Sequence, residues 1–154
     1  MTVRYSGSTD ASTSHANELL EKAISYYDQY LALKDSGAVR VDRALCQYYE
    51  EETSKATAAL EQLTQDMPDY GPAWANLGML YESAGNSDQA REAYQKAQEA
   101  DADDEYGAKT YATRRISAMD SAASSSAGTT DSTSATTSGS STTGSTGVKG
   151  LSDT

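Results

Sequence analysis

The residue types that most often carry chemistry are scarce in this chain. His15 is the only histidine and Cys46 the only cysteine. A two-histidine metal site, a cysteine-rich zinc site and an internal disulfide framework are therefore excluded, and a Ser-His-Asp arrangement would have no base beyond His15. His15 stands at the start of an expected helix, where we interpret it as a solvated side chain. Cys46 stands beside Leu45 and Tyr48, which favours a small packing residue over a reactive thiol.

An acidic cluster is the strongest candidate for a metal site. Asp101, Asp103 and Glu105 follow the alternating spacing of calcium-loop ligands. However, Tyr106 stands where such a loop requires glycine, and Ala112 stands where it requires the closing glutamate. We therefore expect these acidic residues to cap a helix, because negative charge is favourable in a first helical turn. There is no glycine-rich phosphate loop and no G-x-S-x-G elbow, so the sequence predicts no metal, no cofactor and no enzyme.

The overall charge limits the kinds of partner. The 154 residues carry a formal net charge of -11, whereas nucleic-acid-binding surfaces are basic. A protein or peptide, neutral or with basic residues, is the better candidate, and nucleic acid is not expected. No apolar run approaches the roughly 20 residues of a membrane span, and residues 1–13 lack the sections of a signal peptide. We therefore expect a soluble, cytoplasmic protein without membrane insertion.

The aromatic residues mark the part of the chain that folds. All eleven tyrosines and the single tryptophan lie at or before Tyr111, and there is no phenylalanine. We predict a helical domain over residues 15–120, with a disordered segment before it (residues 1–14). Residues 121–154 are rich in serine, threonine and glycine, and we predict a disordered tail that serves as a linker or tether.

The domain is expected to begin with an amphipathic helix from Ser14 to about Lys34. Asp35 to Gly37 end it, and Gly37 suits the left-handed position that closes a helix. Charged residues lie outside the apolar stripe, which comprises Ala16, Leu19, Leu20, Ala23, Tyr27, Tyr30 and Leu31.

Two tyrosine doublets are candidate surface anchors. Tyr26 and Tyr27 cannot both point inward, because adjacent helical residues are about 100° apart, and the same holds for Tyr48 and Tyr49. One member of each pair is therefore available to a partner or to a neighbouring helix.

Residues 74–97 have the pattern of a helical hairpin. One apolar face recurs at i, i+3, i+4 and i+7, the turn falls at Gly85 and Asn86, and a second face follows at the same period. The small side chains of Gly78 and Ala90 allow the two helix axes to approach to about 8–10 Å. We predict a structural core of Trp74, Leu77, Gly78, Tyr81, Ala90, Tyr94 and Ala97.

This pattern resembles a known repeat family. The run W-x-x-L-G-x-x-Y followed by A-x-x-x-Y-x-x-A is similar to the tetratricopeptide repeat, a helix-turn-helix unit of about 34 residues. The unit would run from Gly71 to Asp104, and it departs from the family pattern at Ala102, where a proline is preferred. The resemblance implies an all-α fold, a short right-handed superhelix of helical hairpins, and a non-catalytic binding scaffold.

A degenerate repeat is expected before the well-matched one, over residues 37–70. Ala56 and Leu60 stand one repeat length before Ala90 and Tyr94. Its first helix departs from the family, with Arg40 in place of Trp74 and Ala44 in place of Gly78. The turn near residues 51–53 is inferred from this register alone, so one continuous helix over residues 39–66 stays open. After the second repeat, a capping helix is expected with an apolar stripe of Ala108, Tyr111, Ala112 and Ile116.

The preferred functional reading is an adaptor that binds a peptide segment of another protein. The resemblance implies that the first helix of each repeat lines the groove. A clamp for a peptide carboxylate is not expected, because Val41, Leu45 and Tyr106 stand where lysine, asparagine and lysine would be needed. The candidate peptide-binding residues are Asn76, Met79, Glu82, Ser83, Lys109 and Thr113.

A structural subunit of a larger complex or homo-oligomer is the alternative reading. In that case the hairpins would dock permanently on a partner or on another copy, and the tail would act as a tether. A large exposed apolar patch would favour this alternative. An enzyme ranks third, because no base, nucleophile and orienting group can be named together.

Overall fold

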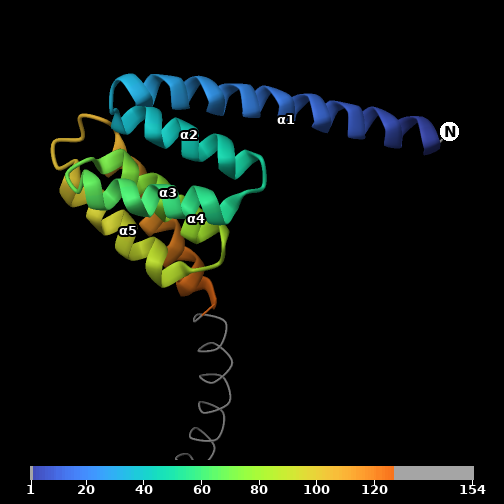
Figure 1. Ribbon diagram of the computed structural model, residues 1–154. Helices are drawn as coiled ribbons and strands as arrows, with labels where there is room; N and C mark the ends of the chain where they lie inside the picture. The colour runs from blue at the N-terminus through green and yellow to red at the C-terminus, as the bar shows by residue number, and fades with distance from the viewer. Residues whose placement is uncertain (1, 127–154) are drawn as a thin grey trace, which may run out of the picture. The chain divides into compact units, whose positions relative to one another are not determined.

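The computed structural model describes residues 2–126, with side chains from residue 11 onward. Over these residues all regular elements are helices, as Figure 1 shows, so the all-α prediction is confirmed. By its contacts the chain divides into residues 1–114 and residues 115–154, and the sites discussed below lie in the first of these units. The helices are α1 (Thr2–Leu33), α2 (Gly37–Tyr49), α3 (Thr53–Asp66), α4 (Gly71–Ser83), α5 (Ser87–Ala100) and a final helix over residues 108–126.

The packing order of the labelled helices follows the chain. Each helix from α1 to α5 contacts the next one, and α2 also contacts α4. This order yields hairpins stacked on one another, α2 with α3 and α4 with α5, which is the arrangement of helical repeats. The main buried cluster is shared by α2, α3 and α4 and comprises Val41, Ala44, Ala56, Leu60, Leu63, Ala73, Leu77 and Leu80.

The first helix begins earlier than the sequence predicts. It starts at Thr2 rather than Ser14, so the secondary structure of residues 2–14 differs from the expected disorder. No proline interrupts these residues, and residues 11–19 are all exposed, so the helix here is formed without burial. The predicted stripe is also corrected, because Leu19 and Tyr30 are exposed while Ile24 is half-buried.

The tail that the sequence predicts to be disordered, residues 121–154, lies mostly outside the described residues. Residues 121–126 continue the final helix, six residues beyond the boundary that the composition suggests. Within this helix the hydroxyls of Ser121 and Ser125 donate to the carbonyls four residues before them, at 2.9 and 3.0 Å. Residues 127–154 are not described.

Gly37 has a different role from the one expected. It opens α2 instead of closing α1, and Ser36 is the N-cap, whose hydroxyl accepts from the Val39 amide at 3.5 Å. A Cβ at residue 37 would lie 3.0 Å from the Tyr70 ring and 3.2 Å from the Met67 sulfur. Glycine is therefore explained by the close approach of the loop between α3 and α4, not by a left-handed backbone.

The glutamate run separates two helices. α2 ends at Tyr49 and α3 begins at Thr53, with Glu51 at φ 66° and the Glu52 amide bonded to the Gln47 carbonyl at 2.9 Å. The one-helix alternative for residues 39–66 is therefore excluded, and the turn inferred from the repeat register is correct.

The α4–α5 hairpin shows why its small residues are needed. A Cβ at Gly78 would lie 2.6 Å from the Tyr94 ring, which is itself fully buried. The hairpin turn contains Gly85 at φ 83°, a conformation that other residues seldom adopt. Leu77, Gly78, Ala90, Tyr94 and Ala97 are buried, whereas Trp74 and Tyr81 are half-buried.

Candidate functional site

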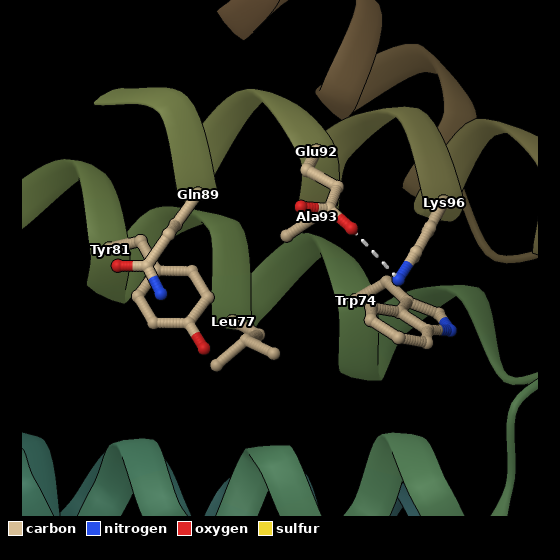
Figure 2. A pocket seen from close by; sticks show the side chains of 7 residues that line it. All are labelled: Trp74, Leu77, Tyr81, Gln89, Glu92, Ala93 and Lys96. Carbon is tan, nitrogen blue, oxygen red and sulfur yellow. Dashed lines mark ion pairs between the residues drawn. The ribbon is translucent and has the colours of Figure 1, made fainter. Parts of the chain in front are cut away.

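Two of the hollows that α4 borders lie on different flanks of this helix. The first, called here the Trp74 hollow, has a volume of about 110 Å³ and lies between α4 and α5. Figure 2 shows Trp74, Leu77 and Tyr81 reaching into it from α4 and four side chains approaching from α5. The α5 residues are Gln89, Glu92, Ala93 and Lys96.

Lys96, Glu92 and Trp74 of the Trp74 hollow are paired within the protein. Lys96 Nζ lies 3.2 Å from a Glu92 carboxylate oxygen and 4.7 Å from the centroid of the Trp74 ring. The Trp74 indole donates to the Pro68 carbonyl at 2.8 Å. This lysine is thus held by a carboxylate and an aromatic face, and the indole ties α4 to the loop before it.

Tyr81 connects the same flank to α3. Its hydroxyl donates to a Glu61 carboxylate oxygen at 2.6 Å. Burial, followed by the hydrogen bond and the charge of Glu61, raises the pKa of Tyr81 to about 12. The phenol therefore remains a donor at neutral pH, and the flank holds α3, α4 and α5 together.

The second hollow, called here the Met79 hollow, lies on the other flank. It has a volume of about 250 Å³ and forms between α4 and the segment that leads into the final helix. It is lined by Pro72, Ala75, Asn76, Met79, Tyr106, Gly107, Ala108 and Tyr111.

Apolar surface and partly exposed polar groups meet in the Met79 hollow. Met79 and Pro72 are half-buried, and the Asn76 amide donates to the Pro72 carbonyl at 2.8 Å, which leaves its side-chain oxygen as an acceptor. Tyr106 is 59 % exposed and Tyr111 is 38 % exposed. The flexible thioether of Met79 lies beside the amphipathic rings of Tyr106 and Tyr111. This combination is suited to an apolar ligand group that also forms hydrogen bonds.

Other tyrosines hold these two rings in place from behind. The Tyr106 ring meets Tyr70 edge to face at 5.4 Å, and the Tyr111 ring meets Tyr94 in the same way at 6.0 Å. Tyr94 in turn donates to a Glu82 carboxylate oxygen at 2.6 Å. The exposed rings are thus positioned before any ligand arrives, which lowers the ordering cost of binding.

The acidic cluster builds the loop that presents Tyr106. Asp101 is buried, and its carboxylate accepts from the backbone amides of Tyr106 (3.2 and 3.3 Å) and Ala108 (2.9 Å). Asp104 accepts from the Thr110 amide at 2.9 Å and from its hydroxyl. The side-chain hydrogen bond from Thr110 is the main cause that lowers the pKa of Asp104. Of the three carboxylates expected to cap the helix, Asp101 does so, and Asp104 is the second capping residue. Among the described residues no three ligand-type side chains could hold a metal ion.

Of the six candidate peptide-binding residues, the structure brings two together in the Met79 hollow, Asn76 and Met79. Glu82 accepts from Tyr94, and Ser83 lies 2.9 Å from the Tyr48 hydroxyl. Lys109 donates to the Ala102 carbonyl at 2.7 Å. Thr113 accepts from Gln98 and donates to a carbonyl of its own helix, both at 2.8 Å.

Sequence reasoning missed both exposed rings of the hollow. The sequence places Tyr111 on the apolar stripe of the final helix, and Tyr106 counts there only as a departure from a calcium loop and from a carboxylate clamp. The signal that could have found Tyr106 is its position after an acidic run, where a capped loop ends and the next helix begins.

The single cysteine and the single histidine both lie outside the two hollows. Cys46 is half-buried, and burial, followed by the charges of Asp42 and Glu50, raises the pKa of its thiol. His15 is exposed, with its ring nitrogen 3.8 Å from a Glu18 carboxylate oxygen.

Comparison with known proteins agrees with the hairpin arrangement. Residues 47–112, which include α3, α4 and α5, match the family model for the tetratricopeptide repeat. These matched residues belong to the tetratricopeptide-repeat family. Among solved structures, the tetratricopeptide-repeat domain of Sgt2 from Aspergillus fumigatus is similar, with 25% identity and a TM-score of 0.52. The match covers 73% of this chain and 78% of that one. A comparison with curated proteins finds no match.

The repeat assignment accounts for the positions of the hollows. In a tetratricopeptide repeat, each hairpin packs its second helix against the first and stacks on the next hairpin. The Trp74 hollow lies inside one repeat, whereas the Met79 hollow lies where that repeat meets the helix that follows. Over the described part of the chain, none of the helices is both long and apolar enough to cross a membrane.

Proposed function

We propose that this tetratricopeptide-repeat protein is a non-catalytic interaction module whose Met79 hollow receives an apolar side chain of a partner's peptide. The observation that carries the proposal is the composition of that hollow. Its walls are mainly apolar, and two partly exposed phenols border it. The Asn76 side chain uses its amide donor within the protein, and its oxygen can accept a hydrogen bond from a ligand. A volume of about 250 Å³ is suited to one large side chain with part of the flanking backbone.

The preferred peptide carries a basic residue near the apolar one. The chain has a net charge of -11, and Asp103 and Glu105 are exposed beside the loop that presents Tyr106. This negative charge would attract basic peptides and mainly increase their association rate. Glu82 contributes less than its position suggests, because its carboxylate already accepts from Tyr94.

The test uses a displayed library of random peptides selected against the full chain, followed by calorimetric titration of the best binders. Tyr106→Ala should weaken a selected peptide by more than about 1 kcal/mol, the usual loss for an interface anchor. Tyr49→Ala is the matched control, because Tyr49 is 64 % exposed and lies outside the hollow. Peptides that bind both variants equally would place the binding site elsewhere.

A second function as an assembly subunit is favoured by a separate observation, the exposed apolar face of α1. It is independent of the Met79 hollow and is developed next.

A further inference from the structure

α1 carries an apolar stripe that no other described helix of its unit covers. The stripe consists of four exposed side chains: Leu19 (54 %), Tyr26 (67 %), Tyr30 (43 %) and Leu33 (90 %). Among the labelled helices, α1 contacts α2 alone, and it does so through an adjacent face. The residues on that adjacent face are half-buried: Leu20, Ala23, Ile24, Tyr27 and Leu31. Four large exposed residues at helical spacing form one continuous patch rather than scattered contacts with solvent.

The repeat register shows what normally covers this face. Tyr26 lies one repeat length before Leu60 and two before Tyr94, and both of those residues are fully buried. In α5, Tyr94 packs against Gly78 of the preceding helix of its hairpin. α1 is therefore in the position of a second helix, but residues 2–18 continue it instead of turning back as a first helix would. The stripe is suited to one more helix, running antiparallel to α1.

The spacing of the stripe is the same in both directions. Leu19, Lys22, Tyr26, Tyr30 and Leu33 are separated by intervals of 3, 4, 4 and 3, with Tyr26 at the centre. An antiparallel copy centred on Tyr26 would place Leu19 opposite Leu33 and Lys22 opposite Tyr30. A two-fold interface requires such a self-complementary patch.

We infer that α1 pairs with the α1 of a second copy of this chain, antiparallel, about a two-fold axis at Tyr26. Leucine meets leucine at both ends of the pair, and the two Tyr26 rings meet in the middle. The Lys22 ammonium meets the electron-rich ring of Tyr30 of the second copy, which supplies charge complementarity next to the apolar contacts. Lys22 is exposed, so this contact requires no rearrangement of the fold.

The size of the patch predicts a reversible dimer. At the exposures given above, the four apolar side chains present on the order of 500 Å² per copy, or roughly 1,000 Å² for the pair, near the lower limit of specific interfaces. Interfaces of this size are typical of weak, transient association.

Sedimentation equilibrium of the full chain from about 1 μM to 1 mM tests the association. The weight-average mass should rise from that of one chain toward that of two. Tyr26→Glu places two like charges at the axis and should raise the dissociation constant by more than about tenfold. Ala32→Glu is the matched control, since it adds the same charge at an exposed position of α1 outside the stripe and should leave association unchanged. Circular dichroism spectra that are equal for the two variants and the native chain would show that folding is unaffected.

Thiol crosslinking tests the direction and register independently. In a Cys46→Ser background, a Leu19→Cys chain mixed with a Leu33→Cys chain should form the mixed disulfide faster than either chain forms one with itself. Tyr26→Cys should crosslink to its own copies, whereas Ser25→Cys should not.

Three outcomes would overturn the inference. A chain that stays monomeric throughout the concentration range would assign the stripe to a helix of a different protein. A dimer that Tyr26→Glu leaves intact would lie on another surface. Faster self-crosslinking of the Leu19→Cys chain would mean a parallel pair.

Discussion

The two flanks of α4 contain similar residue types but differ in how far their polar groups are exposed. Both the Trp74 hollow and the Met79 hollow are lined by aromatic and aliphatic side chains. On the first flank, the indole, the Tyr81 phenol and the Lys96 ammonium all have partners inside the protein. On the second, two phenols are partly exposed and the amide oxygen of Asn76 is available. Residue type alone therefore does not separate a structural flank from the flank proposed to bind a peptide, whereas the exposure of the polar groups distinguishes the two.

The largest effect should come from Tyr94, the residue on which both flanks depend. It is fully buried, fills the space left by Gly78, and supports the Tyr111 ring. Tyr94→Ala should lower the free energy of unfolding by about 3–5 kcal/mol, as large core truncations do. Tyr94→Phe keeps the packing and removes only the hydrogen bonds of the phenol to Glu82 and Tyr111, so it should cost less, about 1–2 kcal/mol. Urea unfolding followed by circular dichroism measures both, and similar losses for the two variants would contradict this account of the core.

Trp74→Ala should have the next largest effect on stability. Trp74 is half-buried with Lys96 over its ring, so its truncation should cost roughly 2–3 kcal/mol, less than a full core deletion. The same urea experiment compares it with Tyr94→Ala. A loss as great as that of Tyr94→Ala would show that the Trp74 flank carries more of the core than its exposure indicates.

The α4–α5 hairpin could be predicted from sequence because its signals are local. Helical periodicity, the turn at Gly85 and the small residue at Gly78 all act within one repeat, and the structure gives each a direct cause. The turn at Glu51 gave no local signal, because a glutamate at positive φ is imposed by the packing of α2 on α3. Its position followed only from the repeat length.

The Met79 hollow could be predicted only in part. Asn76 and Met79 lie off the core stripe of α4, so helix geometry is sufficient to place them together. Tyr106 joins them because the buried Asp101 carboxylate folds the loop through two backbone amides, which is a tertiary contact. Likewise, the exposure of Leu19 and Tyr30 depends on which face of α1 packs against α2. Periodicity identifies an apolar sector but not which half of it is covered.

Alkaline pH offers a smaller, specific test of the Trp74 flank. The pKa of Tyr81 is raised from 10.0 to about 12 in the folded chain, so the interaction stabilises the fold fully below pH 10 and is lost as the pH rises toward 12. The stability gap between the native chain and Tyr81→Phe should therefore narrow over that interval. Urea midpoints measured across it test this, with Tyr49→Phe as a control on an exposed phenol. A gap that stays constant would mean that Tyr81 does not bond to Glu61.

The smallest effect on stability is expected at Tyr106, and it sharpens the comparison most. Tyr106 and Tyr94 are the same residue type, and each ring packs edge to face on another tyrosine, yet Tyr106 is largely exposed. Tyr106→Ala should therefore change the free energy of unfolding by less than about 0.5 kcal/mol, as surface substitutions usually do. The melting curve and a titration with a selected peptide should be measured on the same sample. An unchanged melting curve with weakened binding would assign the ring to the ligand, whereas a loss of stability similar to that of Tyr94→Ala would mean that the two flanks of α4 are both structural.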